Sequence, residues 1–376
     1  MAEQVSGSAA RATGRPFASR GWTIALVLIG LVLAAVVGGV AGGLIVRATW
    51  GSGNGNGNRA TAPVSNGASA ACPAAKVADQ ALPSVVTIRA TSGQGGGSGS
   101  GVVIRSGGYS LTTNHVVSGA AGGGALSILH TDGETTDATI VGRDPLTDLA
   151  VIKAQAASDL PPITLGESES LQVGQPVVAV GSPLGLTSTV TTGIVSALNR
   201  YVRIPAPGGE AAHLVGAIQT DASINPGNSG GALVDCHARL VGINTAVATL
   251  SQGGGSIGLG FAIPIDLARG IASELIAGGK VTRPSLGMQV QTIPQELAHA
   301  TGGSAGLFVA VVTPGGPADK AGLRPGDVIV EVDGEPAHSA DALIVKTIQM
   351  KPGDVIDLTY EREGASHTTS LTLSAD

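Results

Sequence analysis

Short apolar runs rich in Val, Ile and Thr, interrupted by Gly or Pro clusters, dominate this chain after Cys72. Runs of about four to eight such residues between turn-forming residues are typical of β-strands, and many of them at close intervals indicate an all-β barrel or sandwich. Twelve runs fit this description: 84–91, 101–104, 110–112, 126–129, 137–142, 149–153, 176–180, 189–197, 216–220, 232–235, 240–247 and 258–262. We expect the Gly-rich segments 93–101, 122–124 and 253–255 to be loops.

The strand pattern gives way to a helical one at 265–277. Apolar residues recur there at helical spacing, after Pro264 and before two glycines, which are typical start and stop signals. We expect this helix to be the last element of a first domain that begins at Cys72 and ends near residue 280.

The remaining residues, 283–376, are enough for a second domain that folds alone. Strand-like runs return there, with a helix expected near 341–350 and a final hairpin at 361–365.

One long apolar block precedes both domains. Residues 22–46 contain 25 residues without a charge, long enough to cross about 30 Å of hydrocarbon as a helix. Three arginines and one acid lie before this expected transmembrane helix, so the positive-inside bias places residues 1–21 in the cytoplasm and both domains outside. A cleavable signal peptide is the alternative, although its apolar region usually has only about 7 to 15 residues; a buried core helix is another. Residues 47–71, rich in Gly and Asn, predict a flexible linker.

Composition excludes two classes of protein. Gly and Pro account for 58 and 20 of the 376 residues, but 43% of residues are hydrophobic and the net charge is only −6. Disordered chains combine low hydrophobicity with high net charge, so this composition argues against a disordered chain. The acidic balance and the lack of a Lys/Arg cluster argue against nucleic acid as a partner, since phosphate binding needs a basic face.

The two cysteines, Cys72 and Cys236, both fall on the expected outer side of the membrane, where a disulfide can persist. A bridge between them would close a long loop and stabilise the fold by roughly 5 kcal/mol in the chain-entropy model. Two buried free thiols are the alternative.

Three segments place a reactive side chain among small or turn-forming neighbours: TTNHVV with His115, DPLTDLAVIK with Asp148 and DASINPGNSGGALV with Ser229. A serine hydroxyl is a poor nucleophile near neutral pH, so it needs a base within hydrogen-bond reach and a third group that holds the base in the right tautomer. His115 can be that base, and Asp148 can accept the other ring N–H. Taken singly, a histidine in a β-strand or an acid beside one is more often structural; together, in this order, the three favour a catalytic triad.

Glycines around Ser229 predict an oxyanion hole. A tetrahedral intermediate needs two backbone N–H groups aimed at its oxyanion, with no side chain in the way. In GNSGG, Gly227 and Ser229 would supply them, and Pro226 would help to pre-form the loop. No Cys/His spacing suggests zinc, and we expect neither a metal nor a cofactor.

The segments TNHVV, DLAVIK and QTDASINPGNSGGALV resemble the His, Asp and Ser blocks of the HtrA family of serine proteases, and the resemblance covers about residues 76–376. It implies a chymotrypsin-like double β-barrel, with the histidine and aspartate on the first barrel and the serine on the second. It also implies that Ile224 and Leu259 line the pocket for the residue before the scissile bond. Such an aliphatic pocket should prefer small to medium apolar residues; ordinary core positions are the alternative.

Residues 283–376 resemble a PDZ domain in RPSLGMQV and AGLRPGDVIVEVDGEP. The resemblance implies that Ser285, Leu286, Gly287 and Met288 form the loop whose backbone N–H groups bind the C-terminal carboxylate of a peptide, and that the following strand offers an edge for that peptide. A domain that only packs against the protease is the alternative.

Two further features follow from the family resemblance. Arg200 falls where the family carries a sensor arginine, on a loop that responds to the PDZ domain or to substrate. The family also implies a homotrimer. Because the Gly/Ser stretch after Ser92 is short, we expect no long regulatory insertion there.

Together these features predict a mainly β, membrane-anchored serine endopeptidase at the cell membrane, with its protease and PDZ domains extracytoplasmic. We expect it to cleave unfolded, misfolded or signal-bearing proteins in quality control or stress response, under control of C-terminal peptides bound by the PDZ domain. The alternative is a non-proteolytic chaperone or PDZ scaffold that retains the protease fold.

Overall fold

The computed structural model describes residues 72–92, 95–130, 133–155, 160–182, 189–205, 211–245 and 256–375. The expected cytoplasmic tail, transmembrane helix and linker fall in residues 1–71 and lie outside these ranges, as does the expected loop 253–255. Within the ranges described, no helix is both long and apolar enough to cross a membrane.

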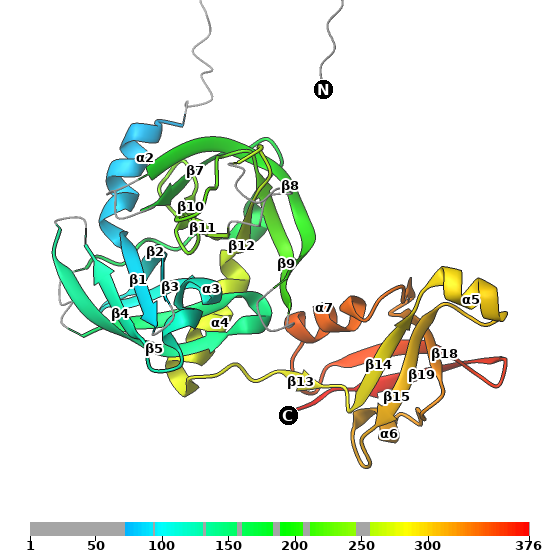
Figure 1. The fold of residues 1–376 in the computed structure, drawn as a ribbon. Coiled ribbons are helices and arrows are strands. Elements are labelled where there is room, and N and C mark those ends of the chain that lie inside the picture. Colours follow the sequence, from blue (N-terminus) through cyan, green and yellow to red (C-terminus); the bar gives the residue numbers. More distant parts are fainter. Residues whose placement is uncertain are drawn as a thin grey trace, which may run out of the picture. The chain divides into compact units, whose positions relative to one another are not determined.

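Two closed antiparallel β-barrels make up the first part of the described chain (Figure 1). The first has the strand order β1-β2-β3-β6-β5-β4, and the second β10-β11-β12-β9-β8-β7. The first barrel consists of β1 (Val85–Ser92), β2 (Gly95–Arg105), β3 (Tyr109–Thr113), β4 (Ala125–Leu129), β5 (Thr135–Asp144) and β6 (Leu149–Ala154). The second consists of β7 (Pro176–Gly181), β8 (Thr189–Pro205), β9 (Ala211–Thr220), β10 (Ala232–Val234), β11 (Leu240–Thr245) and β12 (Gly260–Pro264). Each of the twelve runs predicted from the sequence contributes one of these strands.

The strands are apolar on both faces because each barrel buries one face inside itself and part of the other against its neighbour. In β1, Val86 and Ile88 pack inside the first barrel, whereas Val85 joins a cluster that also contains Val178 and Val180 of the second barrel. Side chains alternate between the two faces of a strand, so one run supplies both cores. Short aliphatic side chains fill both, which is consistent with the small number of aromatic residues in this chain.

Two helices pack on the hydrophobic cluster that joins the barrels. The expected helix at 265–277 is present as α4 (Ile265–Gly278), and its buried residues Ile265, Ala268 and Leu275 pack on the cluster between the barrels. A second helix, α2 (Ala74–Ala81), packs on the same cluster through Val77 and Ala81. Its eight residues form too short an apolar pattern to be recognised as a helix in the sequence.

One expected loop is wrong in the structure. The sequence predicts a loop at the Gly-rich segment 93–101, but β2 begins at Gly95 and its residues 95–102 pair with β1. Strand pairing uses backbone groups, which glycine supplies as well as any residue. Two of these glycines allow close packing: a Cβ on Gly101 would lie 2.8 Å from Cδ1 of Ile88, and one on Gly99 would lie 2.4 Å from Cγ2 of Val116.

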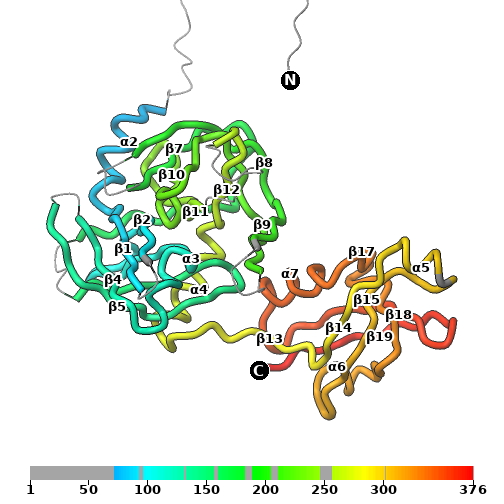
Figure 2. Tube along the Cα trace, in the orientation of Figure 1, coloured from blue at the N-terminus to red at the C-terminus, as the bar shows by residue number. Residues whose placement is uncertain are grey.

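The C-terminal part of the chain forms a separate β-sheet with its own core. Figure 2 traces the chain from α4 through β13 (Pro284–Ser285) into this sheet. The strand order in this sheet is β14-β15-β16-β18-β19, with β17 paired to β16, and β13 and β20 form a separate two-stranded sheet. The strands are β14 (Met288–Ile293), β15 (Gly306–Val312), β16 (Val328–Val332), β17 (Glu335–Pro336), β18 (Val355–Arg362), β19 (Ala365–Thr372) and β20 (Ser374–Ala375), and the helices are α5 (Gln295–Thr301), α6 (Pro317–Lys320) and α7 (Asp341–Gln349). Both the helix expected near 341–350 and the hairpin expected at 361–365 are therefore present.

Candidate active site

His115 and Asp148 lie on the first barrel, where Asp148 contacts His115 twice. Asp148 Oδ2 is 2.8 Å from His115 Nδ1, and Oδ1 accepts the backbone N–H of His115 at 2.9 Å. The carbonyl of Asp148 also accepts the backbone N–H of Asn114 at 2.9 Å. A carboxylate at Nδ1 stabilises the tautomer that carries the proton there, which leaves Nε2 as the proton acceptor.

The backbone explains why Asp148 reaches back to His115. Asp148 follows the short 3₁₀ helix η3 (Pro145–Thr147) in the left-handed conformation, with φ of +57°, and β6 begins directly after it. Aspartate is among the few non-glycine residues that adopt this conformation routinely. Thr245 on β11 of the second barrel donates its hydroxyl to Asp148 Oδ2 at 3.3 Å, so both barrels hold the buried carboxylate.

His115 comes just after strand β3. It lies in α3 (Asn114–Val117), a single helical turn after β3, with Val116 and Val117 buried in the first barrel. Its side chain is 45% exposed, in contrast to the buried Asp148. The imidazole therefore has one edge on the carboxylate and the other accessible.

Ser229 lies in the loop between β9 and β10 of the second barrel and is 4% exposed. Its carbonyl accepts the backbone N–H of Ser100 at 2.8 Å, and the next residue, Gly230, donates to the carbonyl of Asn244 at 2.8 Å. A Cβ on Gly230 would lie 2.1 Å from the carbonyl oxygen of Ser100 and 2.2 Å from Oγ1 of Thr112, and its φ is +81°. Only glycine fits at this position of the GNSGG motif.

Gly99 brings the histidine turn and the serine loop together. A Cβ on Gly99 would lie 2.4 Å from Cγ2 of Val116 and 3.1 Å from the carbonyl oxygen of Ser229. The neighbour of His115 and the backbone of Ser229 thus both pack on one Cα atom. The helical turn that carries His115 and the backbone of Ser229 therefore approach each other at the junction of the two barrels.

Gly227, one expected oxyanion-hole donor, has φ of +100° and is buried. It lies in a tight turn that the N–H of Asn228 closes on the carbonyl of Asn225 at 2.9 Å. The carbonyl of Gly227 accepts the hydroxyl of Ser100 at 2.6 Å.

Sequence reasoning missed the polar residues that support this site, Ser100, Thr112 and Thr245. All three are fully buried in strands. The hydroxyl of Ser100 donates to the serine loop, that of Thr112 donates to the carbonyl of Ser100, and that of Thr245 donates to Asp148. Serine and threonine in a strand carry no specific signal, because exposed strand faces contain them routinely. A hydroxyl within a run expected to be buried on both faces is the signal that could have identified them.

Two predicted site residues have different environments from each other. Ile224 is buried in the core of the second barrel, and a Cβ on Gly260 would lie 2.6 Å from its Cγ1. Leu259, which precedes that glycine, is 52% exposed.

Arg200 is exposed but lies within strand β8, where the register with β9 shifts on both sides of it, so the expected loop position is wrong.

The predicted carboxylate-binding segment runs from the end of β13 to the start of β14. Gly287 has φ of +67°, its N–H lies 3.2 Å from the hydroxyl oxygen of Ser285, and the carbonyl of Leu286 accepts the N–H of Ala318 at 3.1 Å. Met288 then begins β14, which is an edge strand of its sheet. The N–H of Ala340, the residue before α7, donates to Oγ1 of Thr292 on β14 at 3.1 Å. This places the start of α7 beside the open edge.

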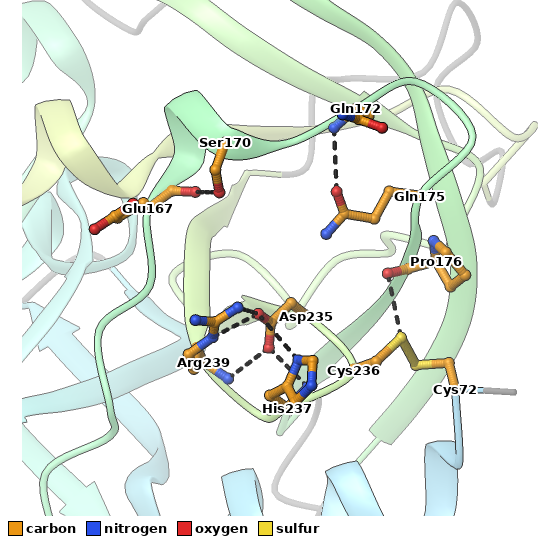
Figure 3. Close-up of polar contacts among 10 residues, drawn as sticks. All are labelled: Cys72, Glu167, Ser170, Gln172, Gln175, Pro176, Asp235, Cys236, His237 and Arg239. Atoms are coloured by element: carbon orange, nitrogen blue, oxygen red, sulfur yellow. Dashed lines mark hydrogen bonds and ion pairs between the residues drawn. A yellow bond between two sulfur atoms is a disulfide. The ribbon is translucent and has the colours of Figure 1, made fainter. Parts of the chain in front are cut away.

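Cys72 and Cys236 form a disulfide (Figure 3). Cys236 lies in the turn between β10 and β11, which Asp235 stabilises. Oδ1 of Asp235 accepts the backbone N–H groups of His237 and Arg239 at 2.8 and 2.9 Å, and Oδ2 binds the Arg239 guanidinium at 2.7 Å. The bridge therefore ties the chain before α2 to a hydrogen-bonded turn of the second barrel. Across the residues that the structure describes, no cluster of His, Cys, Asp or Glu could hold a metal ion.

Comparison with known proteins gives matches over both parts of the chain. Residues 99–243 match the trypsin-like peptidase domain family, and residues 284–373 match the PDZ domain family. Serine protease PepD of Mycobacterium tuberculosis is 43% identical over 364 residues, which cover 91% of this chain and 75% of PepD. Periplasmic serine endoprotease DegP of Salmonella typhimurium is 43% identical over 278 residues, which cover 73% of this chain and 56% of DegP.

Solved structures match as well. HtrA-type protease AlgW with a decapeptide has a TM-score of 0.62 and 36% identity, over 80% of this chain and 98% of that one. The serine endoprotease from Yersinia pestis has a TM-score of 0.59 and 34% identity, over 80% of this chain and 97% of that one.

Proposed function

Because this chain belongs to the HtrA family of serine proteases and is a peptide-bond hydrolase, we propose that His115, Asp148 and Ser229 are its catalytic triad. The observation that carries the proposal is the double contact between Asp148 and His115, which fixes both the ring and the backbone of the histidine. The shared contact of Val116 and Ser229 with Gly99 supports the placement of the nucleophile beside that histidine.

In the proposed reaction, Ser229 Oγ attacks the carbonyl carbon of the scissile bond as His115 Nε2 takes the hydroxyl proton. The imidazolium that forms is stabilised by Asp148, which stays ionised. His115 then gives the proton to the leaving amine, and water repeats the sequence on the acyl-enzyme to release the acid and restore Ser229. The backbone N–H groups of Gly227 and Ser229 stabilise the oxyanion in both halves.

We propose that the substrates are unfolded, misfolded or signal-bearing proteins, cut after small or medium apolar residues. Ile224 and Leu259 support this preference because both are aliphatic, and Ile224 adjoins the segment that carries Leu259. An aliphatic surface gives no partner to a Lys or Arg side chain.

C-terminal peptides are the proposed regulators, bound by Ser285, Leu286, Gly287 and Met288. The open edge of β14 supports this, since an extended peptide can add to it as a strand. AlgW, a structural relative, has been solved with a decapeptide and with a tripeptide. In this proposal Arg200 transmits the presence of the peptide to the catalytic site.

The proposed location is the cell membrane, with residues 22–46 as a single transmembrane anchor and both domains on the extracytoplasmic side, as a homotrimer. The periplasmic relatives and the disulfide between Cys72 and Cys236 support an extracytoplasmic location, because disulfides persist in oxidising compartments. A role in protein quality control or the stress response follows from the proposed substrates.

The test is cleavage of an unfolded protein, such as casein, by the full-length chain in detergent. We expect cleavage that increases when a peptide with an apolar C-terminal residue is added, and none with S229A. The matched control is the same peptide with an amidated C-terminus, which the carboxylate loop should not bind. Cleavage by S229A equal to that of the wild type would contradict the proposed nucleophile, and equal stimulation by the amidated peptide would contradict the proposed carboxylate site.

A further inference from the structure

Ser100 on β2 makes an unusual set of contacts for a strand residue. It is 0% exposed. Its backbone N–H donates to the carbonyl of Ser229 at 2.8 Å, and its hydroxyl donates to the carbonyl of Gly227 at 2.6 Å. One residue of the first barrel therefore binds two carbonyl groups of the loop that carries the proposed oxyanion hole.

The direction of the Ser100 hydroxyl is set by a second strand. The backbone N–H of Ser182, directly after β7, donates to Ser100 Oγ at 2.8 Å. Since that oxygen accepts from Ser182, its own proton is directed to the Gly227 carbonyl. The side chains of Ser182 and Thr87 are also hydrogen-bonded to each other, which connects Ser182 to β1. The Ser100 hydroxyl is thus held between the first strand of the second barrel and the serine loop.

Fixing the Gly227 carbonyl restricts the orientation of the neighbouring N–H groups. The two proposed donors, the N–H groups of Gly227 and Ser229, belong to the peptide units on either side of the Gly227–Asn228 peptide. Pro226 fixes its own φ angle, but Gly227 has no side chain, and its φ of +100° is one that glycine exchanges easily for others. The hydrogen bond from Ser100 and the turn bond from Asn228 to Asn225 both hold this peptide unit.

We propose that Ser100 is a positioning residue for the oxyanion hole. Its hydroxyl keeps the Gly227–Asn228 peptide oriented so that both N–H groups point to the developing oxyanion, and it does so without contact to the substrate. The proposal rests on the proposed triad and oxyanion hole and adds a residue to the machinery that forms them.

The experiment compares S100A with S110A in the full-length enzyme. Ser110 on β3 is also fully buried, and in the described part of the chain its hydroxyl has no hydrogen-bond partner, so S110A is the matched control for removal of a buried hydroxyl. We would measure kcat and KM on a chromogenic peptide with valine before the scissile bond, and the affinity of an aldehyde with the same peptide sequence. The aldehyde forms a tetrahedral adduct with Ser229 that needs the oxyanion hole. The folded fraction, from circular dichroism, normalises each value.

We expect S100A to lower kcat per folded molecule by about 10- to 100-fold, the range that loss of a buried hydrogen bond gives, with KM little changed. Its affinity for the aldehyde should fall by a similar factor, whereas S110A should match the wild type in both. The proposal is overturned if S100A and S110A give equal kcat per folded molecule, or if S100A lowers kcat without weakening the aldehyde. Failure of the proposed function is distinguishable, because the wild type itself would then neither cleave the peptide nor bind the aldehyde.

Discussion

Asp148 binds His115 through both carboxylate oxygens, with Oδ2 on the ring nitrogen Nδ1 at 2.8 Å and Oδ1 on the backbone N–H at 2.9 Å. Asparagine at this position keeps the shape but loses the charge and one acceptor oxygen. We expect D148N to lower kcat by about 10⁴-fold, the loss typical of this change in a Ser-His-Asp triad, with little effect on KM. Steady-state kinetics on the chromogenic peptide test this, and a D148N enzyme within about tenfold of the wild type would rule out the role that we give Asp148.

Gly230 and Gly270 should respond to alanine in opposite ways. A Cβ on Gly230 would lie 2.1 Å from the Ser100 carbonyl oxygen, whereas nothing lies within 4 Å of a Cβ on Gly270 in α4. We expect G230A to abolish activity and lower the free energy of unfolding. G270A should raise it by up to about 1 kcal/mol through helix propensity, with activity unchanged. Urea unfolding with parallel activity assays measures both, and a fully active G230A would show that the serine loop does not need this close packing.

The disulfide between Cys72 and Cys236 spans 164 residues of sequence. Removal of such a crosslink increases the entropy of the unfolded chain, and we expect C72S to lower the free energy of unfolding by about 2 to 5 kcal/mol. The reducing agent dithiothreitol should lower the melting temperature of the wild type to that of C72S and leave C72S itself unaffected. If the wild type and C72S melt at the same temperature without reductant, this bridge contributes nothing to stability.

Asp266 at the start of α4 should make stability depend on pH. Burial by itself raises the pKa of Asp266, but hydrogen bonds from Ser168 and Glu169, with the nearby Arg269, bring that pKa below its usual value. Because the folded-state pKa is the lower one, the stabilisation is complete above the pKa of the unfolded chain and is lost as the pH falls through the folded-state pKa.

We therefore expect D266N to be less stable than the wild type by about 1 to 3 kcal/mol at neutral pH. The difference should shrink as the pH falls below about 4, where the unfolded carboxyl takes up its proton. Urea titrations of both proteins over this pH range test the prediction. A difference that is independent of pH would show that the charge of Asp266 is not responsible.

The strands were predictable from the sequence because both barrels need apolar residues on each face of most strands. Val85 and Val86, for example, serve two different cores, so the run to which they belong is apolar throughout. The segments that carry the proposed active site stood out in the sequence for a different reason, since a nucleophile, a base and an acid must occur together with glycines that expose backbone N–H groups.

The errors arose where tertiary contacts override local composition. The Gly-rich segment has low β-propensity, yet from Gly95 onward it pairs with β1, and the absence of a side chain at Gly99 lets the serine loop and α3 approach. The helical turn at His115 is too short to leave a periodic pattern. Ser100 was missed because its role depends on Gly227 and Ser182, which are distant in sequence and meet it only in the folded chain.

The central claim, that Ser229 is a nucleophile activated by His115, is tested most directly by mapping a fluorophosphonate probe with mass spectrometry. We expect the probe to modify Ser229 alone in the full-length wild type, with H115A slowing the labelling and S229A abolishing it. Modification of another serine, or undiminished labelling of S229A, would contradict the assignment of the active site.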